Sequence, residues 1–196
     1  MILPGLSRPV GTIWCIGRNY AEHAKELGNE VPSAPVVFLK PVSSLMMDGG
    51  TLRIPADSKR VDHEAELVVA YGPSLMMAVG IDFTARDLQG ELKAKGLPWT
   101  SAKGRPGFAA VGNFVPLHLP ADVVLSVNGT TRQKGTTADM LLSVEKIIEH
   151  LNSVYGLTEG DLIFTGTPPG VAPLEAGNKI DARLNLGESR LRLTVA

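Results

Sequence analysis

The sequence contains very little cysteine and no excess of basic residues. Cys15 is the only cysteine in 196 residues, so no intrachain disulfide can form and a cysteine-based zinc site lacks its ligands. Lys and Arg total 19 against 20 Asp and Glu, which gives a net charge of -1. A protein that binds duplex nucleic acid needs a basic surface to displace counterions. We therefore expect no nucleic-acid partner.

Long hydrophobic runs and several well-known catalytic motifs are also missing. No apolar stretch approaches the roughly 18 residues that a membrane span requires, and residues 1–5 contain neither a basic region nor an apolar signal stretch. We therefore expect a cytoplasmic protein with no membrane partner. The chain also lacks a GxxxxGK[ST] phosphate loop and a GxSxG nucleophile elbow. Position 67 is Leu, so His63-Glu64 does not continue into a zinc-peptidase HExxH motif.

Glycine and proline, by contrast, are abundant. Hydrophobic residues make up 44% and charged residues 20% of the chain, close to a soluble globular average. The 21 glycines and 14 prolines predict many tight turns and favour strands over a helical bundle. The length fits a single domain spanning residues 1–196 and is short for two domains. We predict a strand-rich α+β fold.

Apolar patterning locates the expected elements. Short apolar runs predict strands at residues 13–16, 36–40, 64–71, 79–83, 123–127 and 162–165. Asn128-Gly129 suits a tight type I′ hairpin turn, and the alternation over residues 180–195 predicts a terminal hairpin with one exposed face. Helices are predicted from an Asn19 cap with Glu22 to Leu27, from a Thr84 cap with Asp87 to Lys95, and over residues 140–151.

Three acidic residues on neighbouring predicted strands form the first candidate site. Glu64 and Glu66 alternate on one strand, so their side chains share a face with backbones about 7 Å apart. Asp82 lies at the end of the next apolar run. Carboxylates in buried strands repel one another unless a cation lies between them, and hard oxygen ligands suit Mg²⁺, Mn²⁺ or Ca²⁺. The alternatives are an exposed strand end for the glutamates and a helix-terminal contact for Asp82.

Other polar residues follow these acids in the sequence. Arg86 and Gln89 are i, i+3 neighbours on the predicted helix, where they either reach one anionic ligand or are ordinary solvated residues. Lys103 lies in a glycine-rich segment that we expect to be a surface loop. The Thr-Gly-Thr-Pro turn at residues 165–168 offers a hydroxyl and backbone amides that could hold a carboxylate, although a plain turn has the same composition.

His23 and Glu26 form a second constellation on the helix expected after Asn19. They are i, i+3 neighbours at the edge of its apolar stripe. A carboxylate that binds an imidazole raises its basicity and fixes its orientation, which makes a general base able to activate water. A helix-surface ion pair has the same spacing and is the commoner case.

The order of these motifs resembles the fumarylacetoacetate hydrolase family, in particular its compact acylpyruvate hydrolase and oxaloacetate decarboxylase-like branch. The segments that carry the resemblance are Gly17-Arg18-Asn19-Tyr20 with His23 and Glu26, Phe38-Leu39-Lys40-Pro41, His63-Glu64-Ala65-Glu66-Leu67, Asp82 to Gln89, Lys103, Val127-Asn128-Gly129 and Thr165-Gly166-Thr167-Pro168. They extend over nearly the whole chain.

The resemblance implies a fold, a cofactor and a set of site residues. The fold is the mixed β-sandwich or β-roll of the family's C-terminal domain, usually a homodimer, with one Mg²⁺ or Mn²⁺ per subunit. By position, Glu64, Glu66 and Asp82 match the metal ligands, Arg86, Gln89, Lys103 and Thr167 match residues around the keto acid, and His23 and Glu26 match the catalytic dyad.

The same resemblance implies hydrolysis of a C–C bond in acylpyruvates through a pyruvate enolate, with decarboxylation of oxaloacetate through the same enolate. The expected partner is a small anionic keto acid. The alternatives are an isomerase or decarboxylase of hydroxymuconate-type diacids in aromatic catabolism and a non-catalytic keto-acid- or metal-binding protein. Residues 72–78 are shorter than the family's usual excursion, and residues 104–112 lack its Ser/Asn/Cys-rich segment. Both departures bear on substrate identity.

Overall fold

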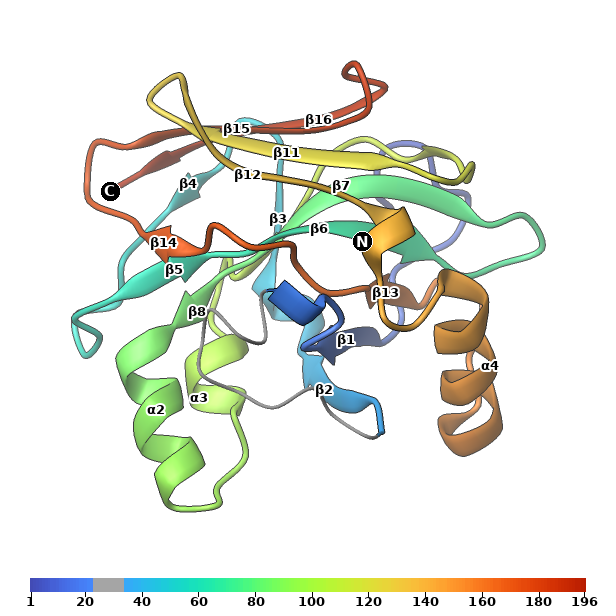
Figure 1. The fold of residues 1–196 in the computed structure, drawn as a ribbon, viewed down its shortest axis with the longest axis horizontal. Helices are drawn as coiled ribbons and strands as arrows, with labels where there is room; N and C mark the ends of the chain where they lie inside the picture. The colour runs from blue at the N-terminus through green and yellow to red at the C-terminus, as the bar shows by residue number, and fades with distance from the viewer. Residues whose placement is uncertain (23–33) are drawn as a thin grey trace.

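A mixed eight-stranded sheet organises the chain (Figure 1). The structure is a computed structural model that describes residues 1–22 and 34–196. The strand order is β2-β1-β13-β6-β7-β9-β3, with β10 paired to β7. These strands are β1 (Ile13–Gly17), β2 (Val36–Lys40), β3 (Leu45–Met47), β6 (Ala65–Ala70), β7 (Met76–Asp82), β9 (Ala109–Val111), β10 (Val115–Pro116) and β13 (Leu162–Phe164). The central strands β6 and β13 are buried on both faces, which explains their continuous apolar runs.

A second, five-stranded sheet covers one face of the first (Figure 1). Its order is β12-β11-β15-β16-β4, from β4 (Thr51–Leu52), β11 (Asp122–Val127), β12 (Thr130–Thr136), β15 (Lys179–Leu184) and β16 (Ser189–Val195). The inward residues of both sheets share one apolar core, in which Leu67 and Val79 meet Leu125 and Leu191. This two-layer packing confirms the predicted strand-rich α+β sandwich.

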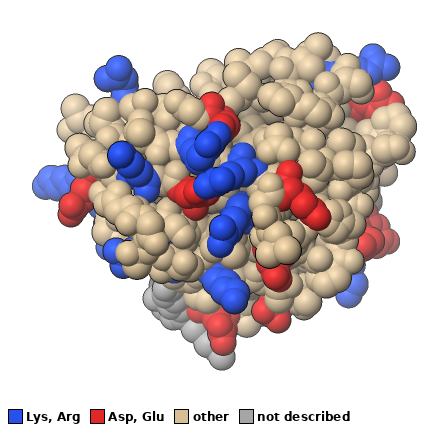
Figure 2. All heavy atoms as spheres, turned by 90° about the horizontal axis from the view of Figure 1, so that it is seen from above, with Lys and Arg blue, Asp and Glu red and all other residues tan. Residues whose placement is uncertain are grey.

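The turns that join the outer strands follow the predicted chemistry. Asn128 and Gly129 both have positive φ angles, of 51° and 78°, as a type I′ turn between β11 and β12 requires. Residues of β16 alternate strictly between buried and exposed, so the terminal hairpin has one exposed face as expected. Figure 2 views the molecule from the side of this sheet, where basic side chains gather near the centre with acidic neighbours. Exposed pairs such as Arg192 with Asp48 contribute little to stability.

Helices α2 (Arg86–Ala94) and α3 (Thr100–Lys103) lie on one side of β1 and β2 in Figure 1, and α4 (Val144–Tyr155) lies on the other. Short 3₁₀ turns are formed by Val42–Ser44 and Thr137–Asp139. A small sheet of β14 (Ala172–Pro173), β5 (Val61–His63) and β8 (Thr84–Ala85) lies beside α2. No helix among residues 1–22 and 34–196 is long and apolar enough to cross a membrane.

Two predicted helix starts were wrong. Thr84 does not cap α2, because it pairs in β8 with Asp62, and Ala85 takes the cap position without a side-chain bond. The Asp87 carboxylate instead accepts hydrogen bonds from Ser58 Oγ at 2.8 Å and the Lys59 amide at 2.6 Å, so strand pairing outweighs the local capping box.

The long amphipathic helix also begins later than predicted. Ser143 caps α4, whose first residue is Val144, and Met140 lies in the turn that follows the 3₁₀ segment. Of the helix expected after Asn19, Tyr20, Ala21 and Glu22 belong to the described residues. Tyr20 forms a β-bridge with Met140, and Ala21 and Glu22 are helical. The rest of that prediction lies outside the described residues.

Asp161 joins the first strand to the loop before β13. Its buried carboxylate accepts hydrogen bonds from the Thr12 amide at 2.7 Å, the Trp14 indole at 3.1 Å, and the amide and hydroxyl of Thr158 at 3.1 and 3.2 Å. Because β1 and β13 are neighbouring parallel strands, this one side chain fixes the backbone just before both strands begin.

We expect Asp161→Ala to lower the free energy of unfolding by about 3 kcal/mol, because it leaves several buried donors without acceptors. Asp161→Asn keeps one acceptor oxygen and is expected to lose about half as much. Urea unfolding of the three proteins measures this. A loss below about 0.5 kcal/mol for Asp161→Ala would show that water replaces the carboxylate.

Candidate active site

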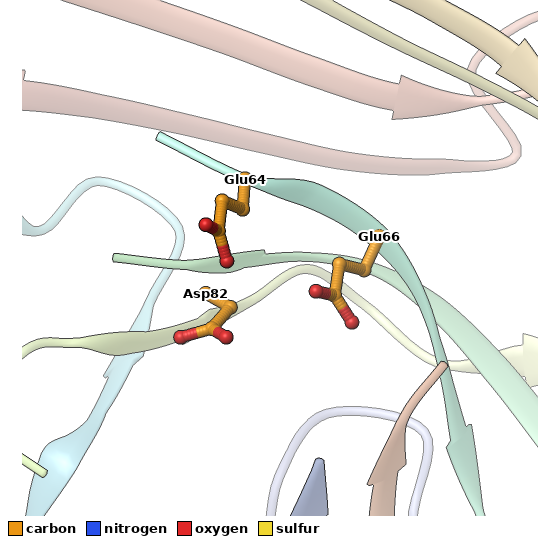
Figure 3. A group of neighbouring side chains, drawn as sticks. All are labelled: Glu64, Glu66 and Asp82. Carbon is orange, nitrogen blue, oxygen red and sulfur yellow. The ribbon is translucent and has the colours of Figure 1, made fainter. Parts of the chain in front are cut away.

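Three carboxylates converge at the edge where β6 and β7 meet. Glu64 lies between β5 and β6, Glu66 lies in β6, and Asp82 ends β7. The antiparallel pairing of β6 with β7, together with a 2.8 Å bond from the Asp82 amide to the Glu64 carbonyl, brings the three backbones together. One oxygen from each side chain lies within 4.8 Å of the others, and Figure 3 shows the side chains turned into one space. The predicted shared face is confirmed.

These three carboxylates are buried, with residue exposures of 5% for Glu64, 3% for Glu66 and 1% for Asp82. Burial raises the pKa of Glu66 well above its usual range, and the nearby charges of Asp82 and Glu64 raise it further. Such a cluster is unfavourable unless cations offset it. The alternative of an exposed polar strand end is therefore wrong for both glutamates.

Lys103 provides one of the compensating charges. Its ammonium lies 2.7 Å from Glu64 Oε2 and 2.6 Å from Asp82 Oδ2. Burial opposes its charged form, but the carboxylates of Asp82 and Glu64 outweigh that effect and raise its pKa. The expectation of a surface loop was wrong, because Lys103 is the last residue of α3 and only 3% exposed.

Lys40 provides a second charge that the sequence reasoning missed. Its ammonium lies 2.6 Å from Asp82 Oδ1 and donates to the backbone carbonyls of Phe83 at 3.2 Å, Phe108 at 2.8 Å and Lys103. Burial lowers the pKa of this lysine, although the Asp82 charge opposes the effect. A lysine that ends an apolar strand just before a proline was the available signal, since such a side chain points into the fold only when it has a partner.

Arg86 and Gln89 lie together, as their spacing predicted. The Arg86 guanidinium donates to Gln89 Oε1 at 2.7 Å, to Asp62 Oδ2 at 2.8 Å and to Glu64 Oε1. Asp62, fully buried and also bound by Arg60 at 2.8 Å, fixes the orientation of the guanidinium. Arg86 therefore aligns Glu64 directly. Since the Gln89 oxygen accepts from Arg86, its side-chain nitrogen is left as a hydrogen-bond donor.

The Thr-Gly-Thr-Pro turn after β13 closes the site on another side. The Gly166 amide donates to Glu66 Oε2 at 2.7 Å. The Thr167 hydroxyl donates to the Ala65 carbonyl at 2.7 Å, so its single proton is already used. The role of this hydroxyl toward a substrate carboxylate stays a prediction. The Thr167 amide, which bonds to none of the described residues, is the available donor of the turn.

Gln133, a residue of β12 in the other sheet, holds this turn in place. Its nitrogen donates to Thr167 Oγ1 at 2.8 Å and to the Pro168 carbonyl at 2.9 Å, and its oxygen accepts from the Ala65 amide at 2.9 Å. The same oxygen accepts from His63 Nδ1 at 2.9 Å, and burial lowers the pKa of that histidine. Nothing in the local sequence of β12 distinguishes Gln133 from a surface residue.

The donor set fits a divalent cation. Glu64, Glu66 and Asp82 offer convergent carboxylate oxygens, which are the ligands that Mg²⁺ and Mn²⁺ prefer. Among the described residues, no Lys, Arg or His forms an ion pair with Glu66, so a metal ion would supply the missing positive charge there. Three carboxylates fill half of an octahedron and leave positions for water and a ligand.

A pocket opens onto these carboxylates. Its lining consists of Ile16, Gly17, Arg18, Phe38, Glu64, Glu66, Asp82, Arg86, Gln89, Lys93, Trp99, Lys103 and Thr167. All seven candidate residues that the structure describes therefore border one space. His23 and Glu26, the proposed dyad, lie outside the described residues, and their roles stay predictions.

We expect Glu66→Gln and Asp82→Asn each to weaken Mg²⁺ or Mn²⁺ binding by at least about 100-fold, because each removes a charged ligand. Titration calorimetry with either ion measures the affinity, and circular dichroism verifies the fold. Asp57→Asn is the matched control, since this acid is exposed and pairs with Arg105 at the surface. Unchanged metal affinity in both site variants would contradict the ligand assignment.

We expect Gln133→Met to lower the free energy of unfolding by about 3 kcal/mol, because four buried polar groups lose their partner. Gln133→Glu keeps the acceptor for Ala65 and removes the donor to Thr167. Both variants are expected to bind oxalate several-fold more weakly than the native protein. Equal oxalate affinity in Gln133→Glu and the native protein would show that Thr167 is held without this side chain.

Comparison with known proteins agrees with the site. The model of the fumarylacetoacetate (FAA) hydrolase C-terminal domain matches residues 12–194. The chain is 46% identical over 188 residues to a mitochondrial oxaloacetate tautomerase of Arabidopsis thaliana, covering 87% of this chain and 84% of that protein. It is 42% identical over 187 residues to a mitochondrial oxaloacetate decarboxylase of Dictyostelium discoideum, covering 86% of each.

A solved structure gives the same result. The crystal structure of fumarylpyruvate hydrolase from Pseudomonas aeruginosa in complex with Mn²⁺ and pyruvate superimposes with a TM-score of 0.92 at 30% identity, covering 100% of this chain and 94% of that one. The predicted resemblance and the predicted fold type are confirmed, and this chain is an enzyme of the fumarylacetoacetate hydrolase family.

Proposed function

We propose that this protein is a divalent-metal-dependent enzyme that interconverts the enol and keto forms of a 2-oxo acid, with oxaloacetate as the candidate substrate. The observation that carries the proposal is the convergence of Glu64, Glu66 and Asp82 beside the buried Lys103. The name of the Arabidopsis relative, an oxaloacetate tautomerase, supports the choice of substrate.

Enolisation of a 2-oxo acid places negative charge on the 2-oxo oxygen. A divalent ion held by the three carboxylates supplies a Lewis acid that makes this charge tolerable. Lys103 contributes a second positive charge at the same place, since the carboxylates of Asp82 and Glu64 raise its pKa although burial opposes its charged form. We assign it the role of an electrostatic partner of the enolate oxygen.

The remaining residues orient these groups. Lys40 has no free direction, since Asp82 and three backbone carbonyls surround its ammonium, so it holds Asp82. Arg86 aligns Glu64, and the amide of Thr167, a residue that lines the pocket, is the proposed donor to the substrate's first carboxylate. Tautomerisation then moves one proton between C3 and the 2-oxo oxygen, and no water molecule attacks the substrate.

Hydrolysis of acylpyruvates is the second candidate function. It leaves the same kind of enolate, that of pyruvate, and a fumarylpyruvate hydrolase shares this fold. It additionally needs a base that activates water, and no histidine lines the described part of the pocket. The proposed base is His23 oriented by Glu26. Decarboxylation of oxaloacetate, as in the name of the Dictyostelium relative, generates this enolate without water attack.

Turnover assays separate these reactions. We expect the native protein with Mg²⁺ or Mn²⁺ to accelerate the loss of enol-oxaloacetate, followed by its ultraviolet absorbance, and EDTA to abolish the acceleration. Asp82→Asn is expected to lose at least about 100-fold in rate, while Asp57→Asn keeps the native rate. Equal acceleration with EDTA would contradict a metal-dependent reaction.

His23→Ala tests the second candidate. If this histidine activates water, the variant loses at least about 100-fold in hydrolysis of acetylpyruvate and much less in decarboxylation of oxaloacetate. Both products are measured on the same protein sample by coupled assays for pyruvate. Equal losses in the two reactions would contradict a water-activating role. A hydroxymuconate-type diacid in the same screen tests the isomerase alternative.

A further inference from the structure

A second group of cations lies in the pocket, apart from those that neutralise the carboxylates. Arg18 and Lys93 line the pocket, but neither forms an ion pair within the described part of the chain. Lys40, Lys103 and Arg86, in contrast, are each bound to an acid. Within the described part of the chain, the cations beside the three acids are therefore paired, whereas Arg18 and Lys93 add positive charge without a paired acid.

Helix α2 explains how Lys93 comes to this position. Arg86, Gln89 and Lys93 are spaced i, i+3 and i+7, so they follow one face of the helix, and all three line the pocket. The rise from Arg86 to Lys93 is about 10 Å. Since Arg86 binds Glu64 beside the acids and Lys93 is an exposed residue, this helix face leads from the metal-ligand carboxylates to the mouth of the pocket.

The aromatic side chains between these two charged regions keep Lys93 directed into the pocket. The Lys93 ammonium lies 5.3 Å from the ring centre of Trp99, whose ring is tilted against Phe38 with 5.5 Å between the ring centres. Both rings line the pocket and give it an apolar wall. Partial burial and the nearby positive charges of Arg18, Arg86 and Lys103 lower the pKa of Lys93, and the charge of Glu64 opposes this effect.

Arg18 occupies an unusual backbone position. Its φ angle is 59°, in the left-handed region that residues with a side chain rarely adopt outside turns. It follows β1 and precedes Asn19, whose amide group is anchored to the Leu142 backbone and to the Thr165 carbonyl at 2.8 Å. A conformation of this kind persists when the surrounding structure imposes it, and it is frequent at ligand-binding sites.

We propose that Arg18 and Lys93 form a second anion subsite at the pocket mouth, which binds the distal carboxylate of a 2-oxo diacid whose first carboxylate and 2-oxo group lie at the metal-ligand acids. The inference rests on the proposed function and names its substrate class: dianionic 2-oxo diacids in preference to monoanionic 2-oxo acids. The two charged regions recognise the two ends, and the wall of Phe38 and Trp99 packs along the carbon chain between them.

Binding of unreactive ligands tests the subsite without turnover. N-oxalylglycine carries an oxalyl head and a distal carboxylate, and N-propyloxamate carries the same head with an ethyl group in place of that carboxylate. Calorimetry with the Mg²⁺-loaded protein is expected to give at least tenfold tighter binding of N-oxalylglycine. Lys93→Met and Arg18→Gln are each expected to reduce this preference at least fivefold and to leave the affinity for N-propyloxamate within twofold.

Lys95→Met is the matched control, because it removes the same charge from the exposed end of the same helix outside the pocket lining. It is expected to keep the native preference. The subsite is wrong if Lys93→Met and Arg18→Gln keep that preference, if they weaken both ligands equally, or if Lys95→Met reduces the preference as much as they do.

The outcomes also separate this inference from the proposed function. If the protein tautomerises oxaloacetate but both variants keep the native ligand preference, the function stands and the subsite is overturned. If no 2-oxo acid is turned over but the preference depends on Lys93 and Arg18, the subsite stands and the reaction assigned to it is wrong.

Discussion

The concentration of negative charge at the junction of β6 and β7 is the constraint on which the site depends. Glu64, Glu66 and Asp82 are buried within a few ångströms of one another, a placement that is stable only with positive charge close by. The chain supplies that charge from two directions, through Lys40 at the end of β2 and Lys103 at the end of α3. A metal ion would add to this compensation and would be held by the carboxylates themselves.

The two sheets contribute different residues to this site. The eight-stranded sheet supplies Glu66 and Asp82 of the three clustered acids and, through β13, the turn that carries Thr167. The five-stranded sheet supplies Gln133, which connects that turn to the Ala65 backbone and to His63. The sandwich interface therefore reaches the site directly, so a change in sheet packing would also move the groups that face a ligand.

The distribution of charge along the pocket connects the structure with its chemistry. Lys40, Lys103 and Arg86 are paired with Asp82 and Glu64, beside the place where a metal ion would be held. Toward the exposed end of α2, the cations Arg18 and Lys93 have no acidic partner among the described residues. We propose that this second region selects a substrate with charge at both ends, and that the reaction takes place at the three carboxylates.

The sequence by itself determined the strand pattern, the shared face of the glutamates and the nearness of Arg86 to Gln89, because each depends on residues a few positions apart. Contacts between residues that are far apart in the sequence were decided only by the tertiary structure. Lys40 meets Asp82 and Gln133 meets Thr167 across different elements. Strand pairing likewise places Thr84 in β8 and not at the predicted helix cap, since a ladder with β5 satisfies more backbone groups than one cap. Local patterns carry no information about such long-range partners.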